Sequence, residues 1–409
     1  MAWQAVIEQP ARGTVLDGVR RLAEHSTRLS NGSSSILVLS DLALLCCYLR
    51  VADGRSQWSA RAVEYLNMAV GELAEKGLRA PWLFGGLAGV GWTIQHVMDM
   101  TRRAGDPLQS DADELEEIDA VLIHYLEQTN WSGSFDLING LVGIGVYFLE
   151  RPDRDLSRRA VSLIVRHLEK MSEAHPEGIA WLSPPRENHG ERSTAHYNLG
   201  VAHGVPGVIA FLGLVHQRNV ENEIATRLLH GALAWLRSSE RPASAETRFG
   251  SWVEPGGYQP ESRVGWCYGD LGIGLVVLNT SLRANDHGSH AWALGLLERC
   301  LEWPVDHYSV RDSALCHGAL GVAHIFNRVY QSTHDLRFRQ AANAWYERSI
   351  ALRRPGVGID GFFQYRTDSD PPYHSDTTFL NGTVGIGLAL LAGASDFEPG
   401  WDRLLLVGS

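Results

Sequence analysis

Residues 140–149 read GLVGIGVYFL, a Gly-x-x-Gly element that leads straight into a small apolar run. The same pattern returns five more times along the chain, with first glycines at Gly86, Gly204, Gly269, Gly318 and Gly382. A degenerate copy opens the chain at residues 32–35, where the second glycine is missing. Successive copies start 49 to 65 residues apart, which is enough chain for two helices and their loops. The pattern therefore indicates an internal repeat built from helix pairs.

The two helices of each expected pair differ in character. One begins at the glycine motif and is apolar almost all round. The other is amphipathic: in residues 163–171 the side chains facing one way recur at i, i+1, i+4, i+5 and i+8, and charged side chains occupy the opposite face. Residues 224–236 and 341–352 repeat this pattern, and no segment shows the sustained alternation that is typical of strands.

This division predicts an all-α fold, an α/α toroid in which amphipathic outer helices surround apolar inner ones. Glycines at the starts of the inner helices would let neighbouring backbones approach closely. A linear helical solenoid is the alternative, but the long connections at residues 239–266 and 354–380 favour the toroid. Composition does not shift along the chain, so we expect a single domain spanning residues 1–409.

Composition excludes several classes of protein. The formal net charge of −11 argues against nucleic-acid binding, which needs a dense basic face. No apolar run is long enough to span a bilayer, and the N-terminus does not have the pattern of a secretory signal. The cysteines are too sparse and too few for a disulfide framework and favour a reduced, cytoplasmic setting: Cys46, Cys47, Cys267, Cys300 and Cys316.

If the inner helices all point the same way, the residues just before each glycine motif meet on one rim of the toroid. Numbered back from the first glycine, position −2 holds Cys267 and Cys316, and position −1 holds Tyr268, His317 and His203. The remaining reactive or aromatic residues near the motifs are Asp136 at −4, Trp266 at −3, and Arg263 and Asp376 at −6. The sequence thus concentrates its reactive side chains at one register.

Two cysteines and an adjacent histidine suit zinc, which favours thiolate and imidazole ligands. Three protein ligands would leave a fourth tetrahedral position open, as in catalytic zinc sites. The spacing of Cys267, Cys316 and His317 is not that of a zinc finger, so the argument depends on their shared register. The alternative is that both cysteines are buried small apolar residues.

Four segments together resemble the lanthionine synthetase C-like family, which includes the cyclases of class I lanthipeptide biosynthesis. They are RVGWCYG at residues 263–269, LCHG at 315–318, AHG at 202–204 and DLING at 136–140. The resemblance covers essentially the whole chain. It implies a toroid of about seven inner and seven outer helices and a zinc-dependent reaction. In that reaction a peptide cysteine thiol adds, Michael-fashion, to dehydroalanine or dehydrobutyrine and closes a (methyl)lanthionine ring.

The resemblance also implies roles for individual residues. Cys267, Cys316 and His317 match the family's zinc ligands, while His203 and Asp136 match its proposed acid/base pair. Three further residues match the positions that surround the active site: Arg263, Trp266 and Tyr268.

The chemistry fits these residue types. We expect His203 to protonate the α-carbon of the enolate, with Asp136 fixing its orientation and tautomer. Arg263 would stabilise the enolate oxygen, and Tyr268 is a second proton donor. We expect Trp266 to form a wall of the substrate pocket. Structural alternatives remain for three of them: His203 as a structural histidine before its glycine turn, Asp136 as a helix cap, and Arg263 as a brace of its loop.

The other histidines and cysteines receive simpler interpretations. We expect three residues on the rim to line the substrate groove or to be solvated: His196, His374 and Asp376. We expect a second group to be structural or exposed: His287, His290 and His324. The cysteines outside the shared register should pack between helices: Cys46, Cys47 and Cys300.

Three other functions compete with the cyclase. A relative in the same family could add glutathione or another thiol to dehydroamino acids. An α/α-barrel glycosidase or lyase could use Asp136 and Asp376 as its carboxylate pair, but this leaves the Cys/Cys/His register unexplained. A non-catalytic peptide-binding toroid is the third.

For a cyclase, the expected partner is a dehydrated precursor peptide with leader and core. A separate dehydratase and a transporter would work in the same assembly. The expected location is the cytoplasm, with peripheral attachment to the inner membrane face through those partners left open.

Overall fold

The computed structural model describes residues 3–30, 35–77, 80–105, 115–185, 187–188, 191–192 and 194–408. Within these residues the chain forms fourteen α-helices, two short 3-10 helices and nine strands of two or three residues each. Residues 32–34 of the degenerate first copy lie outside the described residues, but Ser35 caps the helix that follows, its side chain accepting the backbone N–H of Val38.

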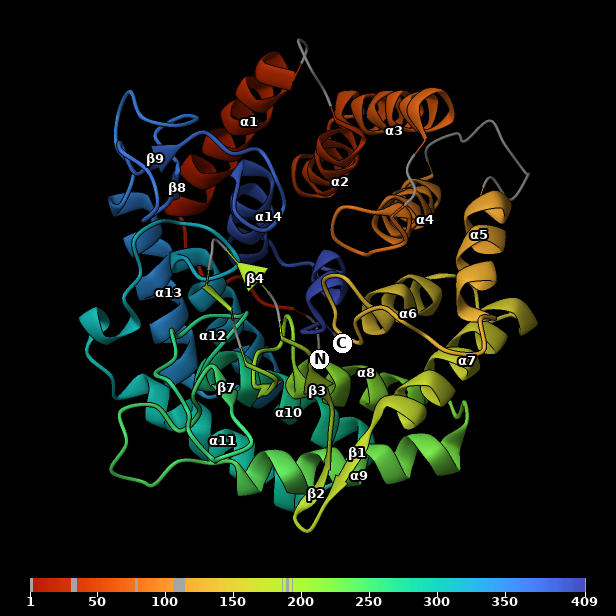
Figure 1. The fold of residues 1–409 in the computed structure, drawn as a ribbon. Helices are drawn as coiled ribbons and strands as arrows, with labels where there is room; N and C mark the ends of the chain where they lie inside the picture. The colour runs from red at the N-terminus through yellow and green to blue at the C-terminus, as the bar shows by residue number, and fades with distance from the viewer. Residues whose placement is uncertain are drawn as a thin grey trace.

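The helices form two concentric rings, as Figure 1 shows. The inner ring consists of α2 (Ile36–Asp53), α4 (Leu87–Arg103), α6 (Leu141–Glu150), α8 (Val205–Gln217), α10 (Asp270–Ala284), α12 (Ala319–Thr333) and α14 (Thr383–Ala394). The outer ring consists of α1 (Ala11–Ser30), α3 (Gln57–Lys76), α5 (Glu116–Leu126), α7 (Asp155–Met171), α9 (Asn222–Ser238), α11 (His287–Leu301) and α13 (Leu336–Ala351).

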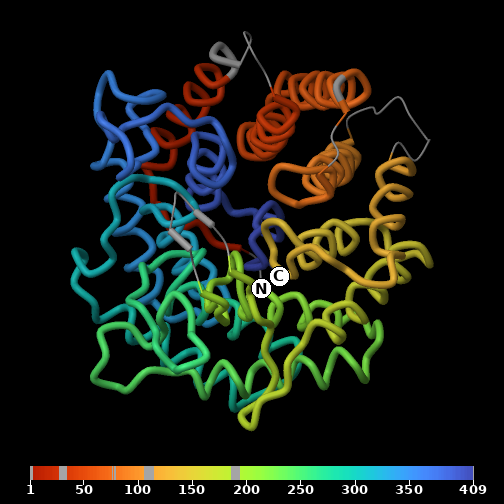
Figure 2. Tube along the Cα trace, in the orientation of Figure 1, coloured from red at the N-terminus to blue at the C-terminus, as the bar shows by residue number. Residues whose placement is uncertain are grey.

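Contacts between consecutive inner helices close the ring. Each inner helix packs against the next, and α14 packs against α2. Figure 2 traces the same path, with the first and last helices side by side. The outer helix α1 contacts both α2 and α14 and so covers the seam. The predicted α/α toroid is therefore confirmed, and a linear solenoid is excluded because its first and last repeats would not meet.

The glycine motifs begin the inner helices and admit a close backbone approach, as predicted, and the backbone that approaches is that of the preceding loop. Each first glycine is the N-cap residue of an inner helix. A Cβ at Gly140 would overlap the Ser134 carbonyl oxygen, and one at Gly143 would overlap that of Leu137. Both glycines thus make room for the loop that precedes their own helix, rather than for a neighbouring helix.

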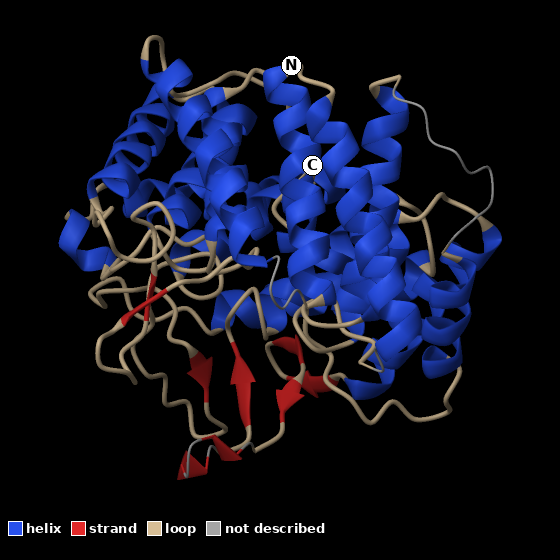
Figure 3. Ribbon diagram, turned by 90° about the horizontal axis from the view of Figure 1, so that it is seen from above, coloured by secondary structure: helices blue, strands red, loops and turns tan. Residues whose placement is uncertain are grey.

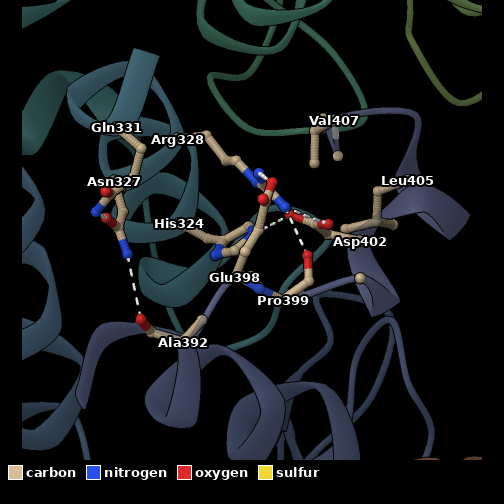
Figure 4. A network of polar contacts seen from close by, with 12 residues as sticks. His324, Asn327, Arg328, Gln331, Ala392, Glu398, Pro399, Asp402, Leu405 and Val407 are labelled. Carbon is tan, nitrogen blue, oxygen red and sulfur yellow. Dashed lines mark hydrogen bonds and ion pairs between the residues drawn. The ribbon is translucent and has the colours of Figure 1, made fainter. Parts of the chain in front are cut away.

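The chain ends inside the toroid. The 3-10 helix η2 (Trp401–Leu405) lies near the middle of the ring, where Trp401 is fully buried (Figure 1). Arg328 of α12 donates to both oxygens of Asp402, at 2.6 and 2.8 Å, and His324 lies 2.7 Å from the same carboxylate (Figure 4). Arg403 pairs with Glu150 of α6 at 2.6 Å. The C-terminal residues 396–408 therefore tie inner helices together from within; we call them the central plug.

The strands lie toward one end of the molecule (Figure 3). All their pairings are antiparallel. A three-stranded sheet joins β3 (Leu182–Ser183), β6 (His196–Asn198) and β7 (Trp252–Val253). The two-stranded pairs are β1 (Glu173–His175) with β2 (Gly178–Ala180), β4 (Glu187–Asn188) with β5 (Glu191–Arg192), and β8 (Gln364–Tyr365) with β9 (Tyr373–His374).

Candidate metal and proton-transfer site

Backbone hydrogen bonds bring the loops before the inner helices together. The residues at position −2 of successive motifs bond to one another: Phe84 N–H donates to Ile138 O, Ala202 to Cys267, Cys267 to Cys316, and Cys316 to Leu380. Position −2 thus runs along the rim as a chain of neighbours. This is why two cysteines that are 49 residues apart in the sequence lie side by side.

Cys267, Cys316 and His317 form a compact cluster on this rim. Their ligand atoms all lie within 4.8 Å of one another, and Cys267 Sγ is 4.0 Å from His317 Nδ1. Cys267 is buried, while Cys316 and His317 are partly exposed. Gly265 permits this approach, because a Cβ there would lie 3.0 Å from the His317 Cα. In the described part of the chain, this is the one group of three such residues close enough to share an ion.

The two thiols influence each other's ionisation. A hydrogen bond from the Cys316 thiol holds the pKa of Cys267 well below its usual range, and His317 and Arg263 lower it further. The same hydrogen bond raises the pKa of Cys316 well above the ordinary value.

This donor set fits a zinc ion. Zinc takes thiolate sulfur at about 2.3 Å and imidazole nitrogen at about 2.0–2.1 Å, so ligand atoms of a tetrahedral site lie roughly 3.5–3.8 Å apart. The ligand atoms of the cluster all lie within 4.8 Å of one another, so small side-chain movements would bring them to this spacing. Since two ligands are sulfur and one is nitrogen, the set suits zinc better than magnesium or calcium, which prefer oxygen.

A histidine–aspartate pair lies on the same rim. His203 Nδ1 is 2.8 Å from Asp136 Oδ2, and the second oxygen of Asp136 accepts the backbone N–H of Asn139 at 2.7 Å. The Asp136 side chain is 1% exposed and that of His203 is 32% exposed. Both carboxylate oxygens are thus engaged, while the imidazole keeps an accessible edge for a reacting group.

Tyr268 and Arg263 lie near the cluster in different settings. Asn198 accepts Gly200 N–H through its side-chain oxygen and donates to the Tyr268 hydroxyl at 3.0 Å. Because that hydroxyl accepts, its own hydrogen is free to point elsewhere. Burial raises the pKa of Tyr268 above the ordinary value. Arg263 is exposed, and its charge lowers the pKa of both cysteines.

Trp266 lies behind the cluster. Its side chain is 1% exposed, and its indole N–H donates to the Leu405 carbonyl of the central plug at 2.9 Å. It packs beside Phe84, with ring centroids 6.5 Å apart. In this arrangement Trp266 connects the metal cluster to the plug.

Position −6 has a structural role in several copies. Asn198, Asp312 and Asp376 each accept the backbone N–H two residues further on, at 2.8, 3.0 and 2.6 Å. Arg263 stands at the same register but cannot accept a hydrogen bond. There the turn changes instead, because Gly269 has a φ of +92° while the other N-cap glycines have negative φ. The motif that carries Cys267 thus departs from the repeat.

Several of the remaining histidines have protein partners, whereas His287 is exposed. His196 lies 2.8 Å from Thr194 O, and His374 lies 2.6 Å from Ser369 Oγ. His324 is buried against Asp402 in the central plug. The cysteines outside the cluster are all buried within helices: Cys46, Cys47 and Cys300.

Sequence reasoning missed Asn198 and Asp41. Asn198 stands at position −6, the register that already contained Arg263 and Asp376, and that register was the available signal. Asp41 belongs to the repeat that lacks the glycine motif. Its carboxylate accepts Phe379 N–H at 2.8 Å and so links the loop before α14 to α2.

A search of the described helices finds none that is long and apolar enough to cross a membrane.

Comparison with known proteins places the chain in a family. The model of the lanthionine synthetase C-like protein family matches residues 28–406. The nisin biosynthesis protein NisC of Lactococcus lactis subsp. lactis is 23% identical over 304 residues, which are 70% of this chain and 71% of that protein. The solved structure of a nisin cyclase superposes with a TM-score of 0.73 and 18% identity, covering 96% of this chain and 97% of that one. A polysaccharide lyase superposes with a TM-score of only 0.40. Since the family model spans nearly the whole chain, this protein belongs to the lanthionine synthetase C-like family.

Proposed function

We propose that this protein is a zinc-dependent lanthipeptide cyclase. In the proposed reaction, a cysteine thiol of a dehydrated precursor peptide adds to the β-carbon of a dehydroalanine or dehydrobutyrine in the same peptide. The S–H bond breaks, a C–S bond forms, and the α-carbon gains a proton, so atoms balance without a co-reactant. The observation that supports this best is the Cys267/Cys316/His317 cluster on the same rim as the His203–Asp136 pair.

Cys267, Cys316 and His317 would hold the zinc. When bound, the ion supplies an open position that favours the thiolate form of a substrate thiol, whose free pKa is about 8.5. The protein's contribution is to fix three ligands on adjacent loops, with the −2 backbone hydrogen bonds setting their positions.

His203 would deliver the proton to the α-carbon. Its accessible edge faces away from Asp136, which holds the Nδ1 side of the ring. Asp136 is itself held by the Asn139 N–H, so it can fix the tautomer of the imidazole. A positioned acid of this kind contributes about 10²–10⁴-fold to a rate.

Arg263 and Tyr268 would act on the developing enolate. Arg263 is exposed beside the thiols and can place a positive charge near the substrate carbonyl oxygen. Tyr268 can offer its hydrogen, because Asn198 occupies the lone-pair side of its hydroxyl. Trp266 would support this arrangement from behind, as the buried wall of the pocket.

The proposed partner is a precursor peptide that another enzyme has already dehydrated, with a transporter acting on the product. The name of the relative NisC, a nisin biosynthesis protein, agrees with a role of this kind. We propose that the protein acts in the cytoplasm.

Two measurements test the function. Elemental analysis of the wild type should give about one zinc per chain, and Cys316→Ala should lose it. Cyclisation leaves the peptide mass unchanged, so ring closure is followed by alkylating free thiols and counting adducts by mass spectrometry.

The expected result is a loss of alkylable thiols in a dehydrated peptide, with wild type and not with Cys316→Ala. A mass increase by one molecule of glutathione when that thiol is supplied would instead favour an intermolecular thiol-adding enzyme. Bound peptide with no change in thiols, from zinc-loaded protein, would favour a non-catalytic peptide-binding toroid.

A further inference from the structure

A cavity lies on the same rim as the metal cluster. It has a volume of about 210 Å³, far more than the roughly 30 Å³ that one water occupies in the liquid. The first turns of α2 and α4 and the loop before α14 surround it, and Leu404 of the central plug lines it as well. It is therefore lined by three inner-ring elements, none of which carries a proposed zinc ligand.

Two of its walls touch the residues of the metal motifs. Leu380 accepts the backbone N–H of Cys316 at 3.0 Å. Phe84 packs against Trp266 on one side and against Phe379 on the other, with centroids 6.5 and 6.3 Å apart. A peptide whose cysteine sits at the cluster can thus reach this cavity with a nearby side chain.

Two side-chain acceptors in the cavity, from Asp41 and Asn381, have no cationic partner among the described residues. Asp41 lines it and accepts only Phe379 N–H among the described residues. The side-chain oxygen of Asn381 is buried there without any partner in the described structure. No described cationic side chain lies within ion-pair distance of Asp41. Burial raises the pKa of Asp41 to about 7, and the nearby Asp376 adds to this. Both effects would be relieved by a positive charge.

The rest of the lining is apolar, and it includes Phe84, Phe379, Leu380 and Leu404. Apolar walls with a carboxylate among them match a long aliphatic side chain that ends in a donor. We infer that this cavity is a substrate subsite for one lysine side chain of the peptide, with its methylene groups along the phenylalanine and leucine side chains and its ammonium at Asp41 and Asn381. The inference rests on the proposed function only in taking the substrate to be a peptide.

The test uses binding rather than catalysis. Short unreactive peptides with one cysteine and no dehydro residue carry either lysine or norleucine at positions around the cysteine. Norleucine keeps the methylene chain and removes the charge. Binding to the full-length zinc-loaded protein is measured by isothermal titration calorimetry. We expect at least one lysine position to bind about tenfold more tightly than its norleucine match, because only the ammonium can form charge-assisted hydrogen bonds with Asp41 and Asn381.

The variant Asp41→Asn should remove this preference, because the amide can still accept Phe379 N–H but carries no charge. Asp286→Asn is the matched control: Asp286 caps the outer helix α11 through two backbone N–H groups, and its neutralisation should leave the preference intact.

Equal binding of lysine and norleucine peptides by the wild type would overturn the inference, as would a preference that survives in Asp41→Asn. Both results come from binding measurements, so neither depends on the catalytic activity of the Asp41→Asn variant. Lysine selectivity without any ring closure would contradict the proposed function alone, and ring closure without lysine selectivity would contradict the subsite alone.

Discussion

Two histidine–aspartate pairs of nearly equal length lie in different parts of the toroid. On the rim, His203 is 2.8 Å from Asp136; in the centre, His324 is 2.7 Å from Asp402. The rim histidine is 32% exposed and the central one 2%. Arg328 also binds Asp402, with bonds to both oxygens, whereas Asn139 alone supplies the second contact to Asp136.

The difference shows that pairing by itself does not mark a proton-transfer site. In the central plug, burial would raise the pKa of Asp402, but Arg328 and His324 hold it at about 2. Burial lowers the pKa of His324 despite its aspartate partner. The Asp402 carboxylate therefore stays ionised over the ordinary pH range, and this buried network stabilises the fold. The rim pair has an open imidazole edge beside the thiol cluster, which is what a proton donor needs.

The largest effect should come from substituting each of the two histidines separately and comparing the results. His203→Gln should lower the rate of ring closure by about 10²–10⁴-fold, because the positioned acid is lost. Its zinc content should match the wild type and its unfolding midpoint should stay close to it, because glutamine can still donate a hydrogen bond to the buried Asp136 carboxylate.

His324→Gln is the counterpart and should do the reverse, lowering the midpoint while folded protein keeps its rate. Thiol alkylation and denaturant unfolding of both variants make the measurement. Loss of activity from His324→Gln at temperatures where it is fully folded would contradict the distinction between the two pairs.

The next effect concerns the central charge network. Arg328→Met should lower the free energy of unfolding by about 3–5 kcal/mol, because it leaves Asp402 buried without its cation. Arg337→Met is the matched control, since Arg337 also forms short ion pairs, with Asp335 and Glu298, but is 59% exposed. Urea unfolding should show no measurable change in the control. Similar losses of unfolding free energy in both variants would mean that the buried ion pair in the central plug contributes no more to stability than an exposed one.

A smaller effect concerns how stability depends on pH. It should differ between Asp402, which has a cation partner, and Asp41, which has none among the described residues. The pKa of Asp402 is lowered to about 2, so its contribution to stability is present above about pH 4 and is lost as pH falls toward 2. The pKa of Asp41 is raised to about 7, so the stability of its protonated form is lost as pH rises from about 4 through 7.

Asp41→Asn should therefore be more stable than the wild type at pH 8, by on the order of 1–2 kcal/mol after allowance for its partial exposure. The two should be equally stable near pH 4. Thermal unfolding across this range measures the gap; a gap that widens toward acid would show that Asp41 carries an unrecognised cation partner.

The sequence predicted the rim better than the centre, for a physical reason. The glycine motif recurs in register, and register alone places Cys267 beside Cys316 because the −2 residues bond to one another around the ring. The side chains at −1, His203 and His317, follow from the same rule. Asp41 could not be found this way, since its repeat lacks the motif that defines the register.

The central plug could not be predicted from sequence periodicity. Residues 396–408 form no amphipathic helix, and Asp402 finds its partners 74 and 78 residues away on α12. Position −6 shows the limit of the register argument. Asp376 shares this position with Arg263, yet its carboxylate closes a turn by accepting Thr378 N–H. A shared register therefore predicts proximity but not the role of a side chain.

The smallest expected effect tests whether the two regions are coupled. Trp266 is the one residue of the metal motif whose side chain donates to the plug, through the 2.9 Å bond from its indole to Leu405 O. Trp266→Phe keeps most of the packing against Phe84 but leaves that buried carbonyl without its donor. We expect a loss of about 1 kcal/mol in unfolding free energy, the usual net contribution of one hydrogen bond. Zinc content should stay at the wild-type level and the rate of ring closure within a few-fold, because the two proposed cysteine ligands are positioned by backbone bonds that the substitution does not touch. If zinc binding weakens along with stability, then the plug holds the cluster in place, and the rim and the centre of the toroid form a single functional unit.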